Sequence, residues 1–514
     1  MKVLIIGSGM SGLTSGAYLA KAGHQVTIYE QHPEIGGVTA TVQKQGFSWD
    51  IGPLLLEGFL PGESAHRILE DLGVADQIKT KRYDRGISFP DFTLWKPETY
   101  EGPDWRKKYL EKRFPEESAG LKKYYQFYEQ MATLLRFNNE VDISKGLKAL
   151  WLKLKMWLAF QKVRDKENWS AEQLMNSCFK GPELKALYTA ILADFVVKPS
   201  QFPAMGVPVS NFETAFDLRI PLDLHSDAPL PGYSYILGGC GQLVQAVAGA
   251  LNHKGGNIHT ATTVKEINIQ DDKAVGVTLA DGHFEPADLV VATGGAKETF
   301  LKLVGITHLE NTFVDQVQRL VPMQSVMMVH LGINFDPEPY QPAALWYYYG
   351  TYDIERGVKE CQKGHYHEGV DGLLIYIPSK HSPNMAPDGH HALTIYTIAP
   401  NILSEKSWSE RKDELADKLV SEAERYIPGL KKGTVTRLVM TPEEFRLRTL
   451  QDHHSFGGLA PVMGQESPSY QTPIKGLWFV GSQSESAGGV KNVMVGARNA
   501  VREIQKHEAT KGRI

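Results

Sequence analysis

The sequence predicts an α/β protein in which separated segments of the chain build one parallel sheet, beside a second, α+β domain with a helical subdomain. Three observations predict this fold class. A buried strand, a glycine-rich turn, a helix and a second strand follow one another over residues 2–30. Nearly continuous apolar runs at 287–294 and 474–481 have the composition of further strands in a sheet covered on both faces. The long segments between them are predicted to form the second domain.

The first segment carries a G-x-G-x-x-G pattern at Gly7, Gly9 and Gly12, between a strand and a helix. Gly7 permits the tight turn, Gly9 lets the backbone approach a pyrophosphate, and Gly12 lets the helix lie close to the strand. The second strand, at 26–29, ends at Glu30, where a carboxylate accepts hydrogen bonds from a ribose diol. The segment therefore predicts a Rossmann-type site for an adenine dinucleotide.

A second glycine pair, Gly36 and Gly37, indicates which dinucleotide binds. FAD continues past the pyrophosphate into a ribityl-flavin arm, and this arm needs close passage along the backbone. Here the sequence resembles the glutathione-reductase-type FAD fold and, within it, the phytoene desaturase and carotenoid isomerase family. That family includes retinol saturases and shares its architecture with the amine oxidases.

The resemblance implies that the middle and the C-terminus complete the FAD site. Val264 corresponds to a residue packed near the adenine, and the glycine-rich loop at 481–489 opens a helix whose N-terminus faces the flavin. Three places depart from the pattern: Val38 stands where many relatives have a basic residue, Ser482 stands where many have an acid, and Ser486 and Ala487 replace a Pro-Gly pair. The predicted FAD-binding residues are Gly7, Ser8, Gly9, Met10, Ser11, Gly12, Glu30, Gln31, Gly37, Val38, Thr39, Pro53, Val264, Gly294, Gly481, Ser482, Gly489, Val490 and Val493.

The predicted domain organisation follows from these segments. Residues 1–94, 231–299 and 441–514 are expected to form the FAD-binding domain. Residues 95–230 are expected to form a helical subdomain that faces substrate or membrane, and residues 300–440 a substrate domain with a mixed or antiparallel sheet.

Composition fits a folded enzyme of more than one domain. The chain has 514 residues, 42% of them hydrophobic and 22% charged, which excludes general disorder. A formal net charge of −4 argues against a nucleic-acid partner. Three scattered cysteines without a C-x-x-C pair exclude a disulfide framework and dithiol–disulfide reductases. With no targeting segment and no membrane-spanning run, we expect cytoplasmic residence, with peripheral contact at the inner face of the membrane left open.

Two features of the second domain have alternative interpretations. In residues 147–160, leucine and aromatic side chains alternate with lysines. This pattern is typical of an amphipathic helix at a membrane interface, and equally of a helix that packs on the core with its lysines in solvent. Alternating residues at 345–349, 373–377 and 392–398 predict strands that wall an apolar tunnel or simply form a core. A surface helix at 407–426 is predicted from a capping box at Ser407 and Glu410.

Catalytic side chains have weak sequence signals. His454, in a loop that passes the flavin in the resembling family, is a candidate for proton transfer, and Glu485 is a second. The simpler explanation is structural: a loop histidine bonded to the backbone, and an acid that caps a helix. The histidines at 365, 367, 390 and 391 lack ligand-spaced acids or cysteines, so no metal site is predicted.

The sequence thus predicts an FAD-dependent oxidoreductase acting on carbon–carbon bonds of an apolar isoprenoid or polyene-like lipid. Desaturation, saturation and cis–trans isomerisation all fit, as do several electron acceptors, and the oligomeric state is open. A flavin amine oxidase is one alternative. A non-catalytic prenyl-lipid carrier of the GDP-dissociation-inhibitor type is another, which the intact glycine and Glu30 unit disfavours.

Overall fold

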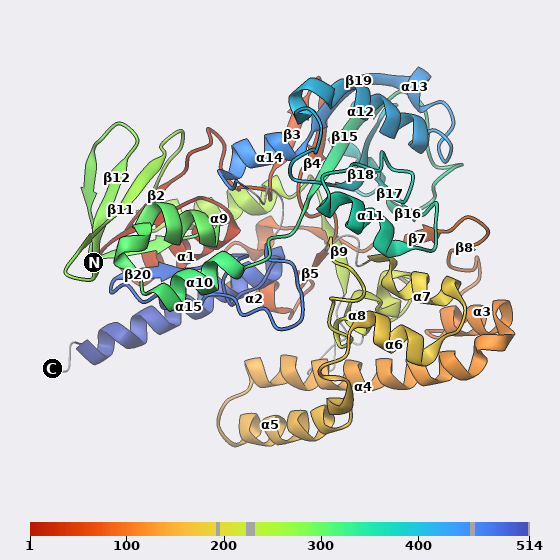
Figure 1. Cartoon of the computed structure of the whole chain (residues 1–514), viewed down its shortest axis with the longest axis horizontal. Helices are drawn as coiled ribbons and strands as arrows, with labels where there is room; N and C mark the ends of the chain where they lie inside the picture. Colours follow the sequence, from red (N-terminus) through yellow and green to blue (C-terminus); the bar gives the residue numbers. More distant parts are fainter. Residues whose placement is uncertain (192–195, 223–231, 453–457, 512–514) are drawn as a thin grey trace.

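The computed structural model describes residues 1–191, 196–222, 232–452 and 458–511. Figure 1 shows three regions: a nucleotide-type α/β lobe that holds both termini, a second lobe around a large sheet, and a layer of helices below them.

The α/β lobe is built on a five-stranded parallel sheet. Its strands lie in the order β10–β2–β1–β14–β20. Their bounds are β1 Lys2–Ile6, β2 Gln25–Tyr29, β10 Asn257–His259, β14 Leu289–Ala292 and β20 Leu477–Phe479. Ile5 of the central strand pairs with Ile28 on one side and Val291 on the other. Three distant parts of the sequence therefore meet in one sheet, as predicted.

Both faces of this sheet are covered, which explains its continuous apolar strands. Val3 and Ile5 pack against helices, whereas Leu4 points to the opposite face. The helical face consists of α1 Met10–Lys21, α2 Ser64–Leu72, α9 Gly241–His253 and α15 Val490–Lys511. The other face consists of the antiparallel strands β11 Val264–Gln270, β12 Lys273–Leu279 and β13 Phe284–Pro286, with the π-helical segment Glu298–Gly305 and α10 Asn311–Arg319.

The second lobe contains a seven-stranded sheet in the order β19–β15–β18–β17–β16–β7–β8. All neighbours pair antiparallel except β16 and β7, so the sheet is mixed. The bounds are β7 Arg85–Ser88, β8 Thr93–Leu94, β15 Ser325–Ile333, β16 Leu345–Tyr348, β17 Leu373–Tyr376, β18 His391–Ala399 and β19 Thr434–Met440. The stretch 85–94, which is predicted to belong to the first FAD-binding segment, 1–94, instead pairs within this second sheet because β7 bonds to β16.

Alternation along these strands produces two apolar faces. One face packs beneath α12, Trp408–Ala423, and α11, Ile354–Gln362, lies beside β18. The predicted surface helix is confirmed: Ser407 and Glu410 form a capping box, and Leu415 and Leu419 are buried. Short elements complete the lobe, namely α13 Leu430–Gly433 and α14 Pro442–Thr449.

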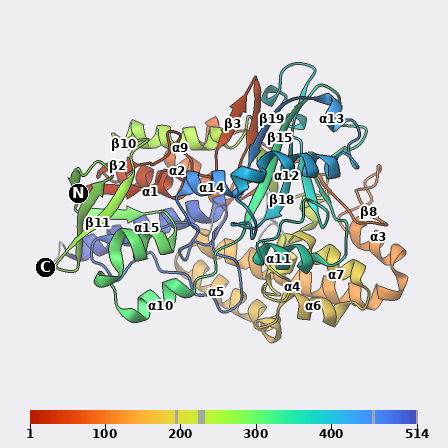
Figure 2. The ribbon, with the colours of Figure 1, turned by 45° about the horizontal axis from the view of Figure 1, so that its top comes forward.

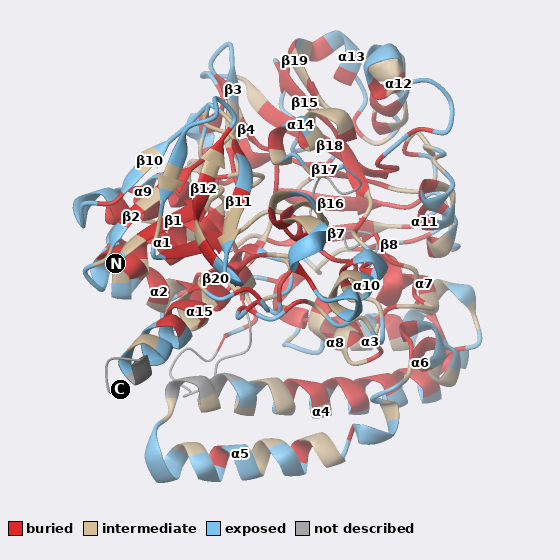
Figure 3. Ribbon diagram, turned by 60° about the vertical axis from the view of Figure 1, so that its left-hand side comes forward, coloured by how far each residue is buried: buried red, intermediate tan, exposed pale blue. Residues whose placement is uncertain are grey.

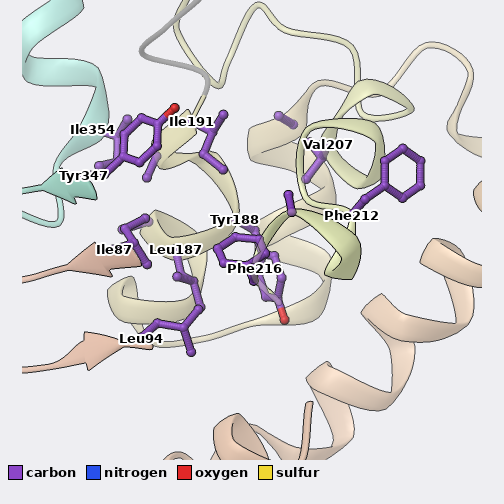
Figure 4. Packing of buried hydrophobic residues seen from close by; sticks show 14 of the residues in the cluster. Ile87, Leu94, Leu187, Tyr188, Ile191, Val207, Phe212, Phe216, Tyr347 and Ile354 are labelled. Carbon is purple, nitrogen blue, oxygen red and sulfur yellow. The ribbon is translucent and has the colours of Figure 1, made fainter. Parts of the chain in front are cut away.

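The opposite face of the seven-stranded sheet meets the helical layer. Figure 4 shows part of this contact, where Ile87 and Tyr347 of the sheet approach Leu187 and Ile191. The helices are α3 Trp105–Arg113, α4 Ser118–Ile143, α5 Gly146–Gln161, α6 Ala171–Cys178, α7 Pro182–Thr189 and α8 Gly206–Ser210. In Figures 1 and 3, α5 lies outermost, separated from the rest of the molecule by α4.

Small strands connect the lobes. The hairpin of β3, Thr41–Lys44, and β4, Phe47–Asp50, follows the second glycine pair. Strand β9, Tyr233–Ile236, pairs with both β5, Leu56–Glu57, and β6, Thr80–Lys81. Figure 2 shows α14 at the junction of the two lobes.

Candidate functional site

The turn after β1 has a backbone that requires glycine at two positions for different reasons. Gly7 has a φ of +97°, and its amide donates to the carbonyl oxygen of Tyr29 over 2.8 Å. At Gly12 an added Cβ would lie only 2.0 Å from the carbonyl oxygen of Gly7. The helix therefore lies directly on the turn, and any side chain at Gly12 would separate them.

Gly9 is different, because an added Cβ there would have no heavy atom within 4 Å. Gly9 is also the N-cap of α1, and no side chain caps the first turn. Met10 and Ser11 follow in that turn and are buried. The unshielded amides at the start of a helix favour an anion, so this open side of Gly9 suits a pyrophosphate.

Glu30 lies at the carboxyl end of β2, beside the same turn. Its side chain is 5% exposed, and its Oε2 accepts hydrogen bonds from the Ser8 amide (2.8 Å) and the Ser8 hydroxyl (2.7 Å). Its Oε1 accepts one from the His32 amide over 2.8 Å. A carboxylate has about four acceptor sites, so Glu30 retains capacity for a ribose diol.

The second glycine pair packs directly against the first turn. The Gly36 amide donates to the Ser8 carbonyl oxygen over 3.0 Å, and Gly36 forms a bridge with Gly9. Both glycines of the pair have positive φ, +102° and +57°. An added Cβ at Gly37 would lie 3.4 Å from the Gly9 Cα. The two glycine motifs therefore form one continuous backbone surface.

The segment that follows the second glycine pair is largely buried, and hydrogen bonds fix it to β4 and to the start of α9. Val38 is half-buried, and Thr39 is buried. Asp50, at the end of β4, accepts from the Thr41 hydroxyl (2.6 Å) and the Cys240 amide (2.8 Å). Burial raises the pKa of the Asp50 carboxyl from 3.8 to about 6. The thiol of Cys240 in turn donates to the Pro53 carbonyl oxygen over 3.4 Å.

The C-terminal loop reaches the same place from the other end of the chain. An added Cβ at Gly481 would lie 3.3 Å from the Ser11 hydroxyl and 3.2 Å from the Thr293 carbonyl oxygen, next to Gly294. Ser482 is half-buried, and Gly489 has a φ of +102° immediately before α15. Val490 and Val493 are buried on the first turn of that helix, and Val264 is buried at the start of β11 in contact with the core that includes Tyr29.

Sequence reasoning missed Arg448, on the last turn of α14. Its Nε donates to the carbonyl oxygen of Gly37 over 2.6 Å, and its Nη1 lies 3.4 Å from Glu34 Oε2 and 3.3 Å from His32 Nε2. The side chain is 7% exposed, and its Nη2 is buried without a hydrogen-bond partner. Burial lowers the pKa of this guanidinium, which Glu34 and Glu30 partly offset. A cation thus lies on the second glycine pair, where Val38 provides none.

Gln31 reaches α14 rather than the glycine surface. Its side-chain amide donates to the carbonyl oxygens of Leu447 and Arg448. Two side chains therefore join the loop after Glu30 to the end of α14: Gln31 from the loop and Arg448 from the helix.

The two predicted catalytic residues have different outcomes. His454 lies outside the described residues. Glu485 is exposed, and its Oε1 accepts a hydrogen bond from the Tyr470 amide over 2.6 Å. Within the described part of the chain, no three His, Cys, Asp or Glu side chains converge as metal ligands would.

The donor set fits an adenine dinucleotide with a long second arm. The Glu30 carboxylate is buried at the end of β2, where a ribose is predicted to bind. Open amides lie at the N-terminus of α1, and a buried N–H of Arg448 lacks an acceptor. Together with the parallel sheet assembled around them and the separate seven-stranded sheet, these groups indicate an FAD-dependent oxidoreductase.

Comparison with known proteins agrees with this class. Residues 10–505 match the family described as flavin containing amine oxidoreductase. The chain belongs to this family, and its cofactor is FAD. It is 24% identical over 506 residues to prolycopene isomerase 2, chloroplastic, from an Oncidium hybrid cultivar, covering 95% of this chain and 81% of the relative.

A second relative is 4,4'-diapolycopene oxygenase from Methylomonas sp, 24% identical over 513 residues, with 96% of this chain and 95% of the relative covered. Among solved structures, an oxidoreductase from Methanosarcina mazei has a TM-score of 0.61 at 19% identity, covering 98% of this chain and 100% of that one. The structural likeness supports the fold.

Proposed function

We propose that this enzyme uses FAD to desaturate, saturate or isomerise carbon–carbon double bonds of an apolar isoprenoid or polyene lipid. The observation that carries the proposal is one apolar cluster joining the second glycine region to the substrate sheet. Ala40 and Ile51, which follow the glycine pair, share this cluster with Tyr347, Tyr376 and Tyr396 of the sheet. An elongated apolar molecule is the kind of substrate that such surroundings accommodate.

Because side chains alternate along a strand, successive residues of this sheet belong to two different apolar clusters. On β16, Tyr347 belongs to the cluster that reaches Ala40, whereas its neighbour Tyr348 belongs to the cluster under α12. Met328 of β15 points to the same side as Tyr347, and methionine adapts its shape to an apolar ligand. The names of the two relatives support a carotenoid-like substrate, since one is a prolycopene isomerase and the other a diapolycopene oxygenase.

In such a reaction FAD, when bound, supplies the redox chemistry by accepting or returning a hydride. The protein's part is to bind and orient. Glu30 and the Gly9 amides fix the nucleotide end, the apolar face of β16 and β18 excludes water, and His454 and Glu485 are the candidates for moving a proton.

The test is to mix the FAD-loaded protein anaerobically with an acyclic polyene and follow the absorbance of oxidised flavin near ~450 nm. Bleaching would indicate that the polyene loses a hydride, as in desaturation. Turnover only after chemical reduction of the flavin would indicate saturation or isomerisation. Absence of turnover in both states would contradict the polyene proposal, and peroxide release with a polyamine would favour amine oxidation instead.

A matched pair of variants ties the result to this face. Tyr347→Leu is expected to change the rate with polyene, because Tyr347 lies on the side that reaches Ala40. Tyr348→Leu alters the other side of the same strand and is expected to leave the rate unchanged. Equal effects of both variants would mean that this face does not contact substrate.

An apolar lipid substrate is dissolved in membranes, so we also propose that the enzyme works at a membrane surface. Within the described residues, none of the helices combines the length and apolar character needed to cross a bilayer. Contact would therefore be peripheral.

A further inference from the structure

Helix α5 exposes most of its large apolar side chains. Six of them have exposed fractions between 47% and 86%: Leu147, Leu150, Trp151, Leu154, Trp157 and Leu158. Figure 3 shows this outer helix as mostly exposed, in contrast to the red, buried side of α4. Single exposed leucines are ordinary, but a contiguous group of this kind on one helix marks a contact surface.

These six side chains form one stripe. Leu147, Leu150, Trp151 and Leu154 stand at i, i+3, i+4 and i+7, and the remaining two continue the same spacing. The buried residues of α5, Leu152 and Ala159, lie on the opposite side of the helix, the side that packs on α4. The stripe therefore points away from the protein, so the core-facing interpretation of this helix does not account for it.

The charge around the stripe has a single sign. Residues 144–163 contain five lysines and no aspartate or glutamate. At 100° per residue, Lys153 flanks one edge of the stripe, and Lys148 and Lys155 flank the other. The Lys155 ammonium lies 5.3 Å from the centre of the Trp151 ring. Lysines beside an apolar stripe let their stems lie along it while their ammonium groups reach anionic groups.

We infer that the α5 stripe, defined by its six exposed apolar residues, docks the protein on a bilayer that carries anionic lipid. The helix lies in the plane of the interface, with leucines and tryptophans among the acyl chains and lysines at the headgroups. Tryptophan is especially suited to this boundary, and Trp151 and Trp157 lie on the stripe. The inference deepens the membrane contact proposed above and does not depend on the identity of the reaction.

The position of α5 brings a docked membrane close to the apolar interior of the protein. The helix packs on α4, whose Tyr124 and Phe127 belong to the apolar cluster that includes Tyr347. In a protein docked through α5, α4 and the apolar cluster to which it contributes therefore lie next to the docked helix. This arrangement suits a substrate that enters from the bilayer.

The test is flotation of the full-length, FAD-loaded protein with substrate-free vesicles of phosphatidylcholine, with or without phosphatidylglycerol. We expect binding to be stronger with phosphatidylglycerol and to weaken in high salt, because exposed charges are screened. The triple variant Trp151→Ser, Leu154→Ser and Trp157→Ser is expected to lower vesicle partitioning by about 10-fold or more, because the apolar anchor is lost.

Two further variants separate apolar from electrostatic contact. Lys148→Glu with Lys153→Glu, one lysine from each edge of the stripe, is expected to reduce binding to anionic vesicles while leaving binding to neutral ones unchanged. Ile306→Ser, Val370→Ser and Ile402→Ser remove three equally exposed apolar side chains elsewhere and are expected to have no effect. Unchanged flavin absorbance and thermal unfolding would show that each variant is folded.

Three results would overturn the inference: wild-type protein that floats with neither vesicle, a stripe variant that binds like wild type, or a control triple that loses binding equally. If the stripe were instead covered by a second copy of the chain, light scattering would show a dimer that the stripe variant converts to monomer. None of these measurements involves turnover, so failure of the polyene proposal would leave them unaffected.

Discussion

Arg448 Nε donates a 2.6 Å hydrogen bond to the carbonyl oxygen of Gly37, a residue 411 positions earlier in the chain. This contact joins α14, which follows the last strand of the seven-stranded sheet, to the loop that carries the second glycine pair. It also places a buried guanidinium with one unpartnered nitrogen beside the surface formed by Gly9 and Gly37.

Arg448→Gln is expected to weaken FAD binding, because the variant removes the cation beside the predicted pyrophosphate position. Hydrogen bonds to charged groups are worth enough that the Kd for FAD should rise about 10- to 100-fold. Titration of apoprotein with FAD, followed by flavin fluorescence, measures it.

Arg446→Gln on the same helix is the matched control and should bind FAD normally. Adding Val38→Arg to Arg448→Gln should restore affinity, since it returns a cation to the glycine pair. An unchanged Kd in Arg448→Gln, or a loss that tracks lower apoprotein stability and resists rescue, would assign Arg448 a packing role only.

Gly9→Ala and Gly12→Ala should differ sharply although both add one methyl group. The new Cβ at Gly9 meets no heavy atom within 4 Å, so the apoprotein should fold normally but bind FAD poorly. The new Cβ at Gly12 overlaps the Gly7 carbonyl oxygen at 2.0 Å and should cost about 1–3 kcal/mol of stability or more. Thermal unfolding of apoprotein together with FAD titration separates the two effects, and normal FAD affinity in Gly9→Ala would contradict the proposed cofactor position.

Asp50 should make the apoprotein less stable as pH rises. Its pKa is raised from 3.8 to about 6 by burial, so the folded state holds this proton more tightly than the unfolded state does. The resulting stabilisation is complete below pH 3.8 and is lost as pH rises through about 6, a difference of roughly 3 kcal/mol.

Asp50→Asn keeps an oxygen acceptor for the Cys240 amide but cannot ionise. Urea unfolding at pH 8 should therefore show the variant to be at least as stable as wild type, while the advantage disappears toward pH 4. A variant that is less stable than wild type at pH 8 would contradict this origin of the shift.

Arg106 and Glu213 form a buried ion pair in the helical layer, with Nη2 and Oε1 at 2.9 Å. Glu213 also accepts from the Tyr125 hydroxyl over 3.0 Å. Removing one charge leaves the other buried and unpaired, so Arg106→Met and Glu213→Gln should each cost about 3–5 kcal/mol. The double variant should cost less than the two losses combined, and strict additivity in urea unfolding would show that the two groups do not interact.

The local part of the nucleotide site could be predicted from sequence because its residues are close in the chain. Gly7, Gly12 and Glu30 are separated by one turn, one helix and one strand, and each element has its own pattern. The helix at α12 was equally predictable, since Ser407 and Glu410 form its cap within one turn.

Contacts between distant segments could not be predicted. Arg448 lies in a capped helix of ordinary composition, and nothing near it indicates Gly37 as its partner. The spacing of apolar residues in α5 indicates a stripe but not which way the stripe faces. That direction is set by the packing of the opposite side of α5 on α4, which is a tertiary contact. The pairing of β7 with β16 likewise depends on the tertiary fold and joins residues 85–88 to 345–348.

The position of β20 has a consequence for how the chain is made. This strand completes the five-stranded sheet beside β14, and α15 packs on α1, so α1 is covered by a helix that is synthesised much later. During translation the apolar strand Lys2–Ile6 and the helix α1 remain incompletely covered until residues beyond 477 have left the ribosome. Sheets that depend on such non-local pairing form slowly, and their apolar surface stays exposed to aggregation until they are complete. The nascent chain should therefore depend on chaperones, and a stop codon before β20 should yield an aggregate rather than a smaller enzyme.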